Sequence, residues 1–185
     1  MFDIRAERSD IMPNHVKNVL KFKKLKPDDI ENIIHLIAIE SEDEPKSYWI
    51  DFNKIIPEPK YESECPDEFK VNKESHIAVN PDKPWFDWYR WRIHYWDTKW
   101  GAYDCYSIMG KSYVTFVFST AWSIAYPVIE RLHLLGYDFE LRYADEDYGS
   151  NCGIITYESE QGFEHQDESS FKDPRRFAIN LWEKY

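Results

Sequence analysis

The stretch SYVTFVFSTAWSIAYPVIERLHLLGYDFELRY, residues 112–143, contains the elements that decide the fold. Residues 112–119 place apolar side chains on both faces of an extended segment, which is typical of a strand covered on both sides. Pro127 then stands near the start of a helix with Val128, Leu132 and Leu135 at i, i+4 and i+7, and Gly136 follows its end. Residues 137–143 alternate between apolar or aromatic and charged side chains. The stretch therefore predicts a strand, a helix and a second strand.

A similar pattern lies upstream. Residues 14–22 alternate as a half-buried strand would, with Asn18 interrupting the pattern. Pro27 opens a helix that carries Ile30, Ile33, Ile34 and Ile37 on one face. Residues 48–56 are rich in apolar and aromatic side chains and predict another strand. Two strand–helix–strand patterns in succession predict an α+β protein with a ferredoxin-like βαββαβ core.

The remaining segments are additions to this core. Residues 57–111 predict a long aromatic insertion, with a short helix between Trp85 and Trp96 and an irregular loop at 97–104. An extra hairpin strand is expected at 154–158 and a C-terminal helix at 174–185. Residues 1–11 read as an N-terminal extension, and residues 12–185 as one domain. Five lysines between residues 17 and 26 are expected on the solvated side of an edge strand and its turn, or in contact with phosphate.

Charge and cysteine content narrow the classes of function. The formal net charge of -11 disfavours nucleic acid and anionic membranes as direct partners and favours basic protein surfaces. Three widely spaced cysteines argue against a disulfide framework and suit a reducing, cytoplasmic setting. The first residues lack the apolar core of a signal peptide, and no apolar run approaches the ~20 residues that span a bilayer. We therefore expect no membrane association.

Five strings, in this order and spacing, carry a family resemblance: MPNHVKNVLKF at 12–22, IIPEP at 55–59, WDTKWGAYD at 96–104, TAWS at 120–123 and YADEDYGSNCG at 143–153. Over residues 12–158 the chain resembles the YubB-like, ferredoxin-like family of bacteriophages and plasmids. The resemblance implies a ferredoxin-like fold, a mobile genetic element as the source and the cytoplasm of a bacterial host as the location. It implies no agreed enzymatic activity. Some phage-borne proteins of this general kind are anti-CRISPR proteins.

Clustered carboxylates make one candidate site. Asp145, Glu146 and Asp147 follow a predicted strand, and Asn151 follows a glycine turn. Oxygen ligands of this kind suit Mg²⁺, so Asp145, Asp147 and Asn151 are the expected metal ligands. In a Mg²⁺-dependent nuclease acting on RNA, Lys99 would stabilise charge and Asp104 would act as the base. The expected catalytic residues are then Asp145, Glu146, Asp147, Lys99 and Asp104. The alternative is a charged hairpin turn with Gly and Asn at positive φ.

Aromatic residues beside arginines make a second candidate site. Trp85, Trp88, Arg90 and Arg92, with Trp100 nearby, could form a stacking platform for single-stranded nucleic acid or a peptide groove. The alternative is core packing, because Trp88, Trp91 and Tyr95 share one helical face. The segment 85–100 holds so many rings that at least one within 85–96 is expected to be exposed.

The third candidate is an acidic stretch. Between residues 138 and 168 there are ten Asp and Glu against one basic residue, Arg142, a local net charge of -9. Within it, Glu158, Glu160 and Glu164 are expected to contact a partner by imitating a phosphate backbone in a basic channel. The leading hypothesis is an inhibitor from a mobile element that binds Cas9 with its guide RNA. The alternatives are the Mg²⁺-dependent ribonuclease and a non-enzymatic structural or regulatory protein.

Overall fold

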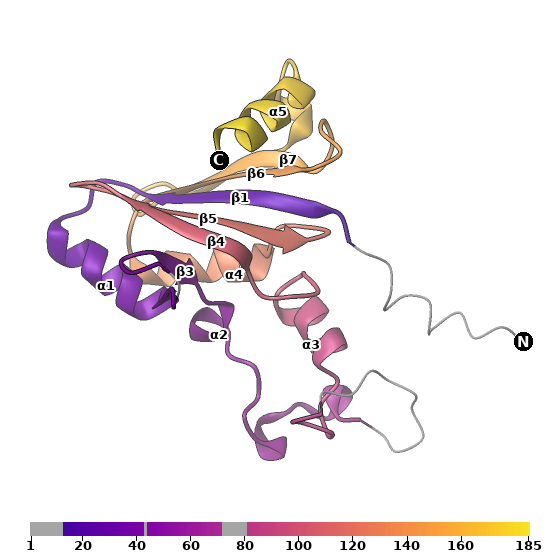
Figure 1. Cartoon of the computed structure of the whole chain (residues 1–185). Coiled ribbons are helices and arrows are strands. Elements are labelled where there is room, and N and C mark those ends of the chain that lie inside the picture. The colour runs from indigo at the N-terminus through magenta and orange to yellow at the C-terminus, as the bar shows by residue number, and fades with distance from the viewer. Residues whose placement is uncertain (1–12, 43, 72–80) are drawn as a thin grey trace, which may run out of the picture.

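A six-stranded antiparallel sheet forms the centre of the protein (Figure 1). The computed structural model describes residues 13–42, 44–71 and 81–185, so the predicted extension at 1–11 lies outside the described residues. The sheet has the order β4-β5-β1-β6-β7-β8. Its strands are β1 (His15–Phe22), β4 (Tyr103–Met109), β5 (Val114–Ala121), β6 (Phe139–Asp145), β7 (Cys152–Glu158) and β8 (Gly162–Gln166).

The ferredoxin-like core predicted from the sequence is confirmed. It runs β1, α1 (Pro27–Ile37), β4, β5, α4 (Tyr126–Arg131) and β6, with β1 between β5 and β6. All eight residues of β5 are buried, as its two apolar faces predict. A short 3-10 helix, η3 (Leu132–Leu135), extends α4 and ends at Gly136, whose φ of 75° is the left-handed conformation expected there.

The position of the second core strand was predicted wrongly. Within residues 48–56 only β3 (Tyr48–Ile50) is extended, and it pairs with β2 (Ala38–Glu40) in a separate two-stranded sheet before α2 (Phe52–Ile55) begins. The second core strand is β4, at 103–109, where a loop and insertion were expected. Because β4 is an edge strand with half-buried and exposed residues and a register shift between Tyr103 and Tyr106, it shows no clean alternation.

The two faces of the sheet carry different layers. Helices α1 and α4 cover one face around Phe22, Phe116 and Phe139, whereas α5 (Pro174–Lys184) covers the other face around Val19 and Val117 (Figure 1). The lysines of β1 therefore lie on a central strand, not on the predicted edge strand. Lys17 Nζ, for example, sits 4.8 Å from the Trp182 ring of α5.

The segment between β3 and β4 is largely irregular. It contains α2, the 3-10 turns η1 (Glu62–Glu64) and η2 (Asp67–Phe69), and α3 (Trp88–Tyr95), which confirms the helix predicted within 85–96. A further turn, η4 (Glu168–Ser170), connects β8 to α5. No helix in the part of the chain that the structure describes is long and apolar enough to cross a membrane.

Candidate functional site

The turn between β6 and β7 holds the predicted carboxylate cluster. Asp145 ends β6, and Asn151 precedes β7 with a φ of 46°. The Asp145 carboxylate accepts the backbone N–H of Asp147 at 2.9 Å and the Asn151 Nδ2 amide at 3.3 Å. The acids thus stand at a strand end, with Asn151 returning across the turn, as the sequence predicts.

The same carboxylates bind donors from the start of β1. Asn14 Nδ2 donates to Asp147 at 2.7 Å and to Asp145 at 3.4 Å, and Glu146 accepts the backbone N–H of His15 at 2.8 Å. The Asp145 residue is only 5% exposed. Within residues 13–42, 44–71 and 81–185, no three His, Cys, Asp or Glu side chains form a group that could hold a metal. The arrangement is that of a hydrogen-bonded turn, and the Mg²⁺ role of Asp145, Asp147 and Asn151 stays a prediction.

Trp122 joins this turn to the loop before β4. Its backbone N–H donates to the Asn14 carbonyl at 2.9 Å, and its carbonyl accepts from Asn151 Nδ2 at 2.9 Å. The Nζ of Lys99 lies 5.6 Å from the Trp122 ring and 4.9 Å from the Trp100 ring. The loop that carries Lys99 and Trp100 and the turn at 145–151 are more than 40 residues apart in the sequence. Both contact Trp122 at one end of the sheet.

Tyr103 connects the start of β4 to β1. Its hydroxyl is 2.6 Å from His15 Nδ1 and donates to the Thr120 carbonyl at 3.2 Å. Burial raises the pKa of Tyr103, and the charges of Asp104 and Glu146 raise it further. The phenol is therefore neutral over the physiological pH range. Asp104, the predicted base, is exposed in β4 with a φ of 49°.

Arg92 stabilises the packing of the aromatic segment at 85–96. Its guanidinium pairs with Glu58 at 2.5 Å and lies 5.1 Å from both the Trp88 and Trp96 rings. These contacts tie α3 to the loop after α2. The prediction of an exposed ring within 85–96 was wrong: Trp91 and Trp96 are buried and the other aromatic rings there, Trp85 and Trp88 included, are half-buried or buried. Packing against the long loop at 57–71 supplies the second side that a short helix alone lacks.

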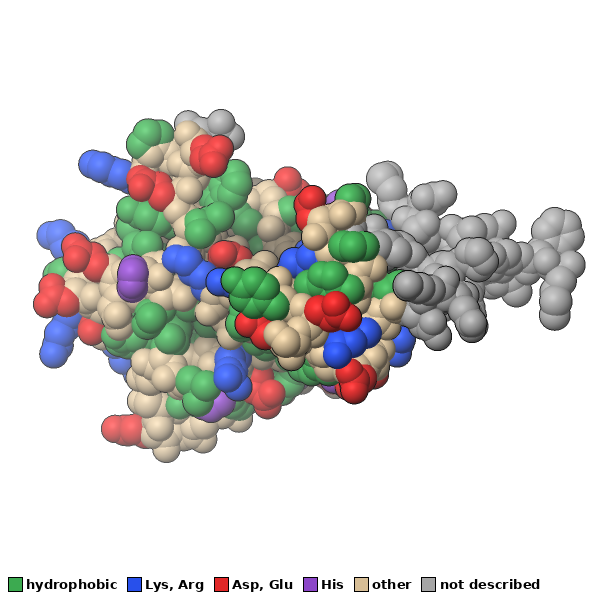
Figure 2. All heavy atoms as spheres, turned by 90° about the horizontal axis from the view of Figure 1, so that it is seen from below, with side chains coloured by type: hydrophobic (Ala, Val, Ile, Leu, Met, Phe, Trp, Pro, Cys, Tyr) green, Lys and Arg blue, Asp and Glu red, His purple; other side chains and the backbone are tan. Residues whose placement is uncertain are grey.

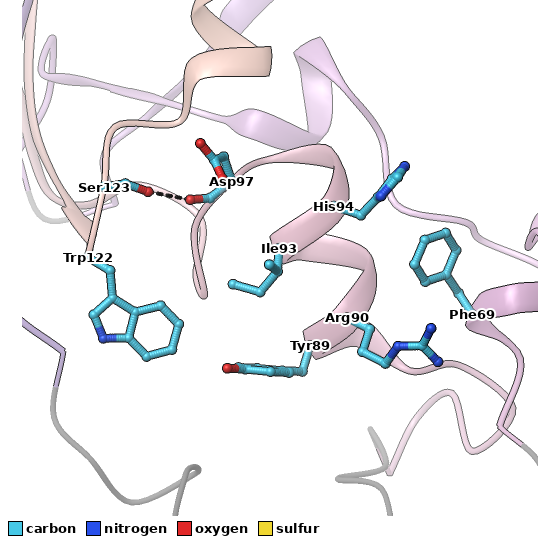
Figure 3. A pocket seen from close by; sticks show the side chains of 8 residues that line it. All are labelled: Phe69, Tyr89, Arg90, Ile93, His94, Asp97, Trp122 and Ser123. Atoms are coloured by element: carbon cyan, nitrogen blue, oxygen red, sulfur yellow. Dashed lines mark hydrogen bonds between the residues drawn. The ribbon is translucent and has the colours of Figure 1, made fainter.

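An open groove of about 760 Å³ runs over the outer face of α3 (Figure 3). Tyr89 and Ile93 point toward Trp122, while Arg90 and His94 point toward Phe69 (Figure 3). Asp97 and Ser123 complete the lining on the Trp122 side. Of these residues, Arg90 was predicted from the sequence as a binding residue, whereas Tyr89, Asp97 and Trp122 were not. The spacing of Tyr89 and Ile93 at i and i+4 could have indicated this face of α3, because it puts both side chains on the same side of the helix.

The acidic stretch is divided by the fold. Asp138 pairs with Lys24 at 2.7 Å and Glu140 with Lys23 at 2.5 Å, near the start of β6, and Asp145 lies at its other end. Lys24 lowers the pKa of Asp138 by hydrogen bonding, and backbone donation from Ser159 adds to this. Glu146 and Asp147 are exposed at the β6–β7 turn, and the other exposed acids lie on and after the β7–β8 hairpin: Glu160, Glu164, Asp167 and Glu168, with Glu158 half-buried beside them. The face in Figure 2 carries acidic, basic and hydrophobic side chains intermingled.

The comparison with known families bears on the fold. Residues 95–176 match the model of a family described as a ferredoxin-like domain in Api92-like protein. This match covers β4 to β8 and the start of α5, less than half of the chain, and includes Trp100, Asp104 and the 145–151 turn. No curated protein and no solved structure matches the chain significantly.

Proposed function

We propose that this protein is an inhibitor, encoded by a mobile genetic element, that binds a bacterial defence nucleoprotein. Cas9 with its guide RNA is the proposed target. The resemblance to a phage and plasmid family and the match to an Api92-like domain support this proposal. The observation that carries it is the exposed acidic β7–β8 hairpin.

The hairpin presents its carboxylates to solvent at the edge of the sheet. None of the ion pairs found among the described residues involves Glu158, Glu160 or Glu164. Glu158 and Glu160 lie close enough to Lys24 to raise its pKa, but Lys24 is hydrogen-bonded to Asp138. The hairpin therefore keeps most of its negative charge available for a partner.

A basic channel is the partner surface that matches such charge. Cas9 holds its guide–target duplex in a positively charged channel and approaches target DNA electrostatically. Acidic side chains on an exposed hairpin can compete for the lysines and arginines of that channel. Exposed charge pairs are screened by salt, so the association is expected to weaken steeply as ionic strength rises.

The charge of the hairpin is tested by reversal. The variant Glu158→Lys, Glu160→Lys, Glu164→Lys is expected to bind Cas9–guide complex about tenfold more weakly or worse, and to lose inhibition of target cleavage. The matched control, Glu31→Lys, Glu42→Lys, Glu68→Lys, makes the same charge change at exposed positions elsewhere and is expected to keep most of both. Equal losses in the two variants would show that only net charge matters. Absence of binding and inhibition by the unaltered protein at micromolar concentration would refute the proposal.

The ribonuclease alternative is resolved in the same assay. Guide RNA recovered from the complex should be intact with and without Mg²⁺ if the protein acts by occupation. Guide cleavage that requires Mg²⁺ and disappears in Asp145→Asn, Asp147→Asn would instead support the catalytic hypothesis. The thermal stability of that variant must be checked, because both carboxylates accept hydrogen bonds that hold the turn.

A further inference from the structure

Two residues that line the α3 groove have an unusual backbone conformation. Asp97 has a φ of 60° and Trp122 a φ of 70°, although neither is glycine. Left-handed backbone is unfavourable for a bulky side chain and persists only where the surroundings impose it, often at ligand sites. Here Ser123 Oγ donates to the Asp97 carbonyl at 2.5 Å, and Asn14 and Asn151 hold the Trp122 backbone. The fold therefore fixes both residues against the same groove.

The Trp122 side of the groove combines aromatic surface with a carboxylate. Tyr89 and Trp122 meet edge to face, with ring centroids 6.3 Å apart, and Ile93 lies beside them (Figure 3). None of the ion pairs found among the described residues involves Asp97. Asp97 is exposed, and partial desolvation of its carboxylate raises its pKa above the ordinary value.

Two cations lie near this side of the groove, one on each flank. The guanidinium of Arg90 lies 4.0 Å from Asp87 and 5.9 Å from the Phe69 ring, on the other side of α3 (Figure 3). The Nζ of Lys99 lies 5.6 Å from the Trp122 ring, but Lys99 does not line the groove. Among the residues that line the groove on the Trp122 side, the charged side chain is that of Asp97.

We propose that this side of the groove binds the guanidinium of an arginine presented by a protein partner. The Asp97 carboxylate, at the Ser123 end of the groove, would accept its N–H groups, and the arginine side chain would lie along the groove against the Trp122 and Tyr89 rings. Arginine suits this pairing better than lysine, because the guanidinium both stacks on rings and donates two parallel hydrogen bonds. A phosphate-bearing ligand is disfavoured by Asp97 and by the net charge of -11. This inference rests on the proposed function and adds the type of partner side chain that the groove binds. It can be tested without Cas9.

The test is an NMR titration of the full chain with the blocked peptide acetyl-Gly-Arg-Gly-amide, followed through the tryptophan indole N–H signals. The Trp122 signal, assigned with Trp122→Gly, is expected to shift most. Asp97→Asn should weaken binding about fivefold to tenfold. Asparagine tolerates the left-handed backbone at this position, so the variant keeps the local fold. Glu31→Gln, an exposed change on α1, is the control and should bind as the unaltered chain does.

Peptide analogues separate charge from shape. The lysine peptide should bind more weakly than the arginine peptide, and the citrulline peptide, which is isosteric but neutral, should bind at least about fivefold more weakly. Equal binding of arginine and citrulline peptides, or no Trp122 shift at any accessible concentration, would overturn the proposal. A single-stranded RNA oligonucleotide that shifted Trp122 at lower concentration than the arginine peptide would overturn it in favour of nucleic acid.

Discussion

Tyr143 illustrates how one buried residue links the core to the acidic hairpin. It is 5% exposed in the centre of β6, and its hydroxyl lies 2.9 Å from His165 Nε2 on β8. Burial raises the pKa of Tyr143 to about 12, and the charge of Glu168 adds to the shift. The same ring leaves no space for a larger residue at Gly153 of β7, since an added Cβ there would lie 2.6 Å from the hydroxyl oxygen.

The raised pKa of Tyr143 predicts a loss of stability at alkaline pH. The folded state holds the phenolic proton more tightly than the unfolded state, whose pKa is about 10. Its contribution is therefore complete below about pH 10 and is lost as the pH rises toward about 12. The free energy of unfolding, measured with urea, should fall between about pH 9 and about pH 11. This fall should be smaller in Tyr143→Phe than in the unaltered protein.

Two half-buried groups should add an alkaline loss of stability that Tyr143→Phe shares with the unaltered protein. Burial also raises the pKa of Tyr103, and of Cys105 to about 12, so part of the alkaline loss should persist in Tyr143→Phe. Tyr61→Phe is the control, because Tyr61 is 66% exposed. Identical pH dependence in Tyr143→Phe and the control would contradict the assignment.

Helix α5 is the element that covers the outer face of the sheet. Ala178 and Leu181 are buried there against Val19, Val117 and Ala144. Two hydrogen bonds hold it in place: Trp182 Nε1 donates to the Ala144 carbonyl at 3.0 Å, and Tyr106 donates to the Tyr185 carbonyl at 2.7 Å. A helix with one apolar stripe gains most of its stability from such packing rather than from its own propensity.

Truncation of Leu181 tests that packing. We expect Leu181→Ala to lower the free energy of unfolding by about 2–3 kcal/mol, because it removes a buried side chain and leaves a cavity against the sheet. Glu183→Ala, an exposed change two residues away, should stay within about 0.5 kcal/mol. Chemical denaturation followed by circular dichroism measures both. A loss no larger in Leu181→Ala than in the control would mean that α5 is not docked as described.

For the whole molecule, the net charge of -11 is the dominant electrostatic fact. Self-repulsion of like charges destabilises a compact state, and salt screens it. Raising NaCl from about 10 mM to about 150 mM shortens the Debye length from about 30 Å to about 8 Å. We expect the midpoint of thermal unfolding to rise by about 2–4 °C, equivalent to roughly 1 kcal/mol. A fall in the midpoint would show that the surface ion pairs outweigh the repulsion.

Local patterns by themselves determined most of the fold. The apolar residues of β5, the isoleucine face of α1 and the alternation of β6 each reflect burial of one element against its neighbours, and the ferredoxin-like plan followed from their order. The turn that places Asp145 beside Asn151 was also predictable, because glycine and asparagine mark left-handed turn positions within a few residues.

Only the tertiary structure decided which segments pair and which side chains meet. Strand β4 carries no strong alternation because it is a half-exposed edge, and β8 is exposed along most of its length, so neither could be recognised without its partner strand. The acidic stretch appeared as one block in the sequence, but lysines from the β1–α1 turn neutralise part of it. Tyr89 and Trp122 lie more than 30 residues apart and form one groove because β5 ends beside α3. Such contacts depend on chain pairing over long sequence separations, which local periodicity does not encode.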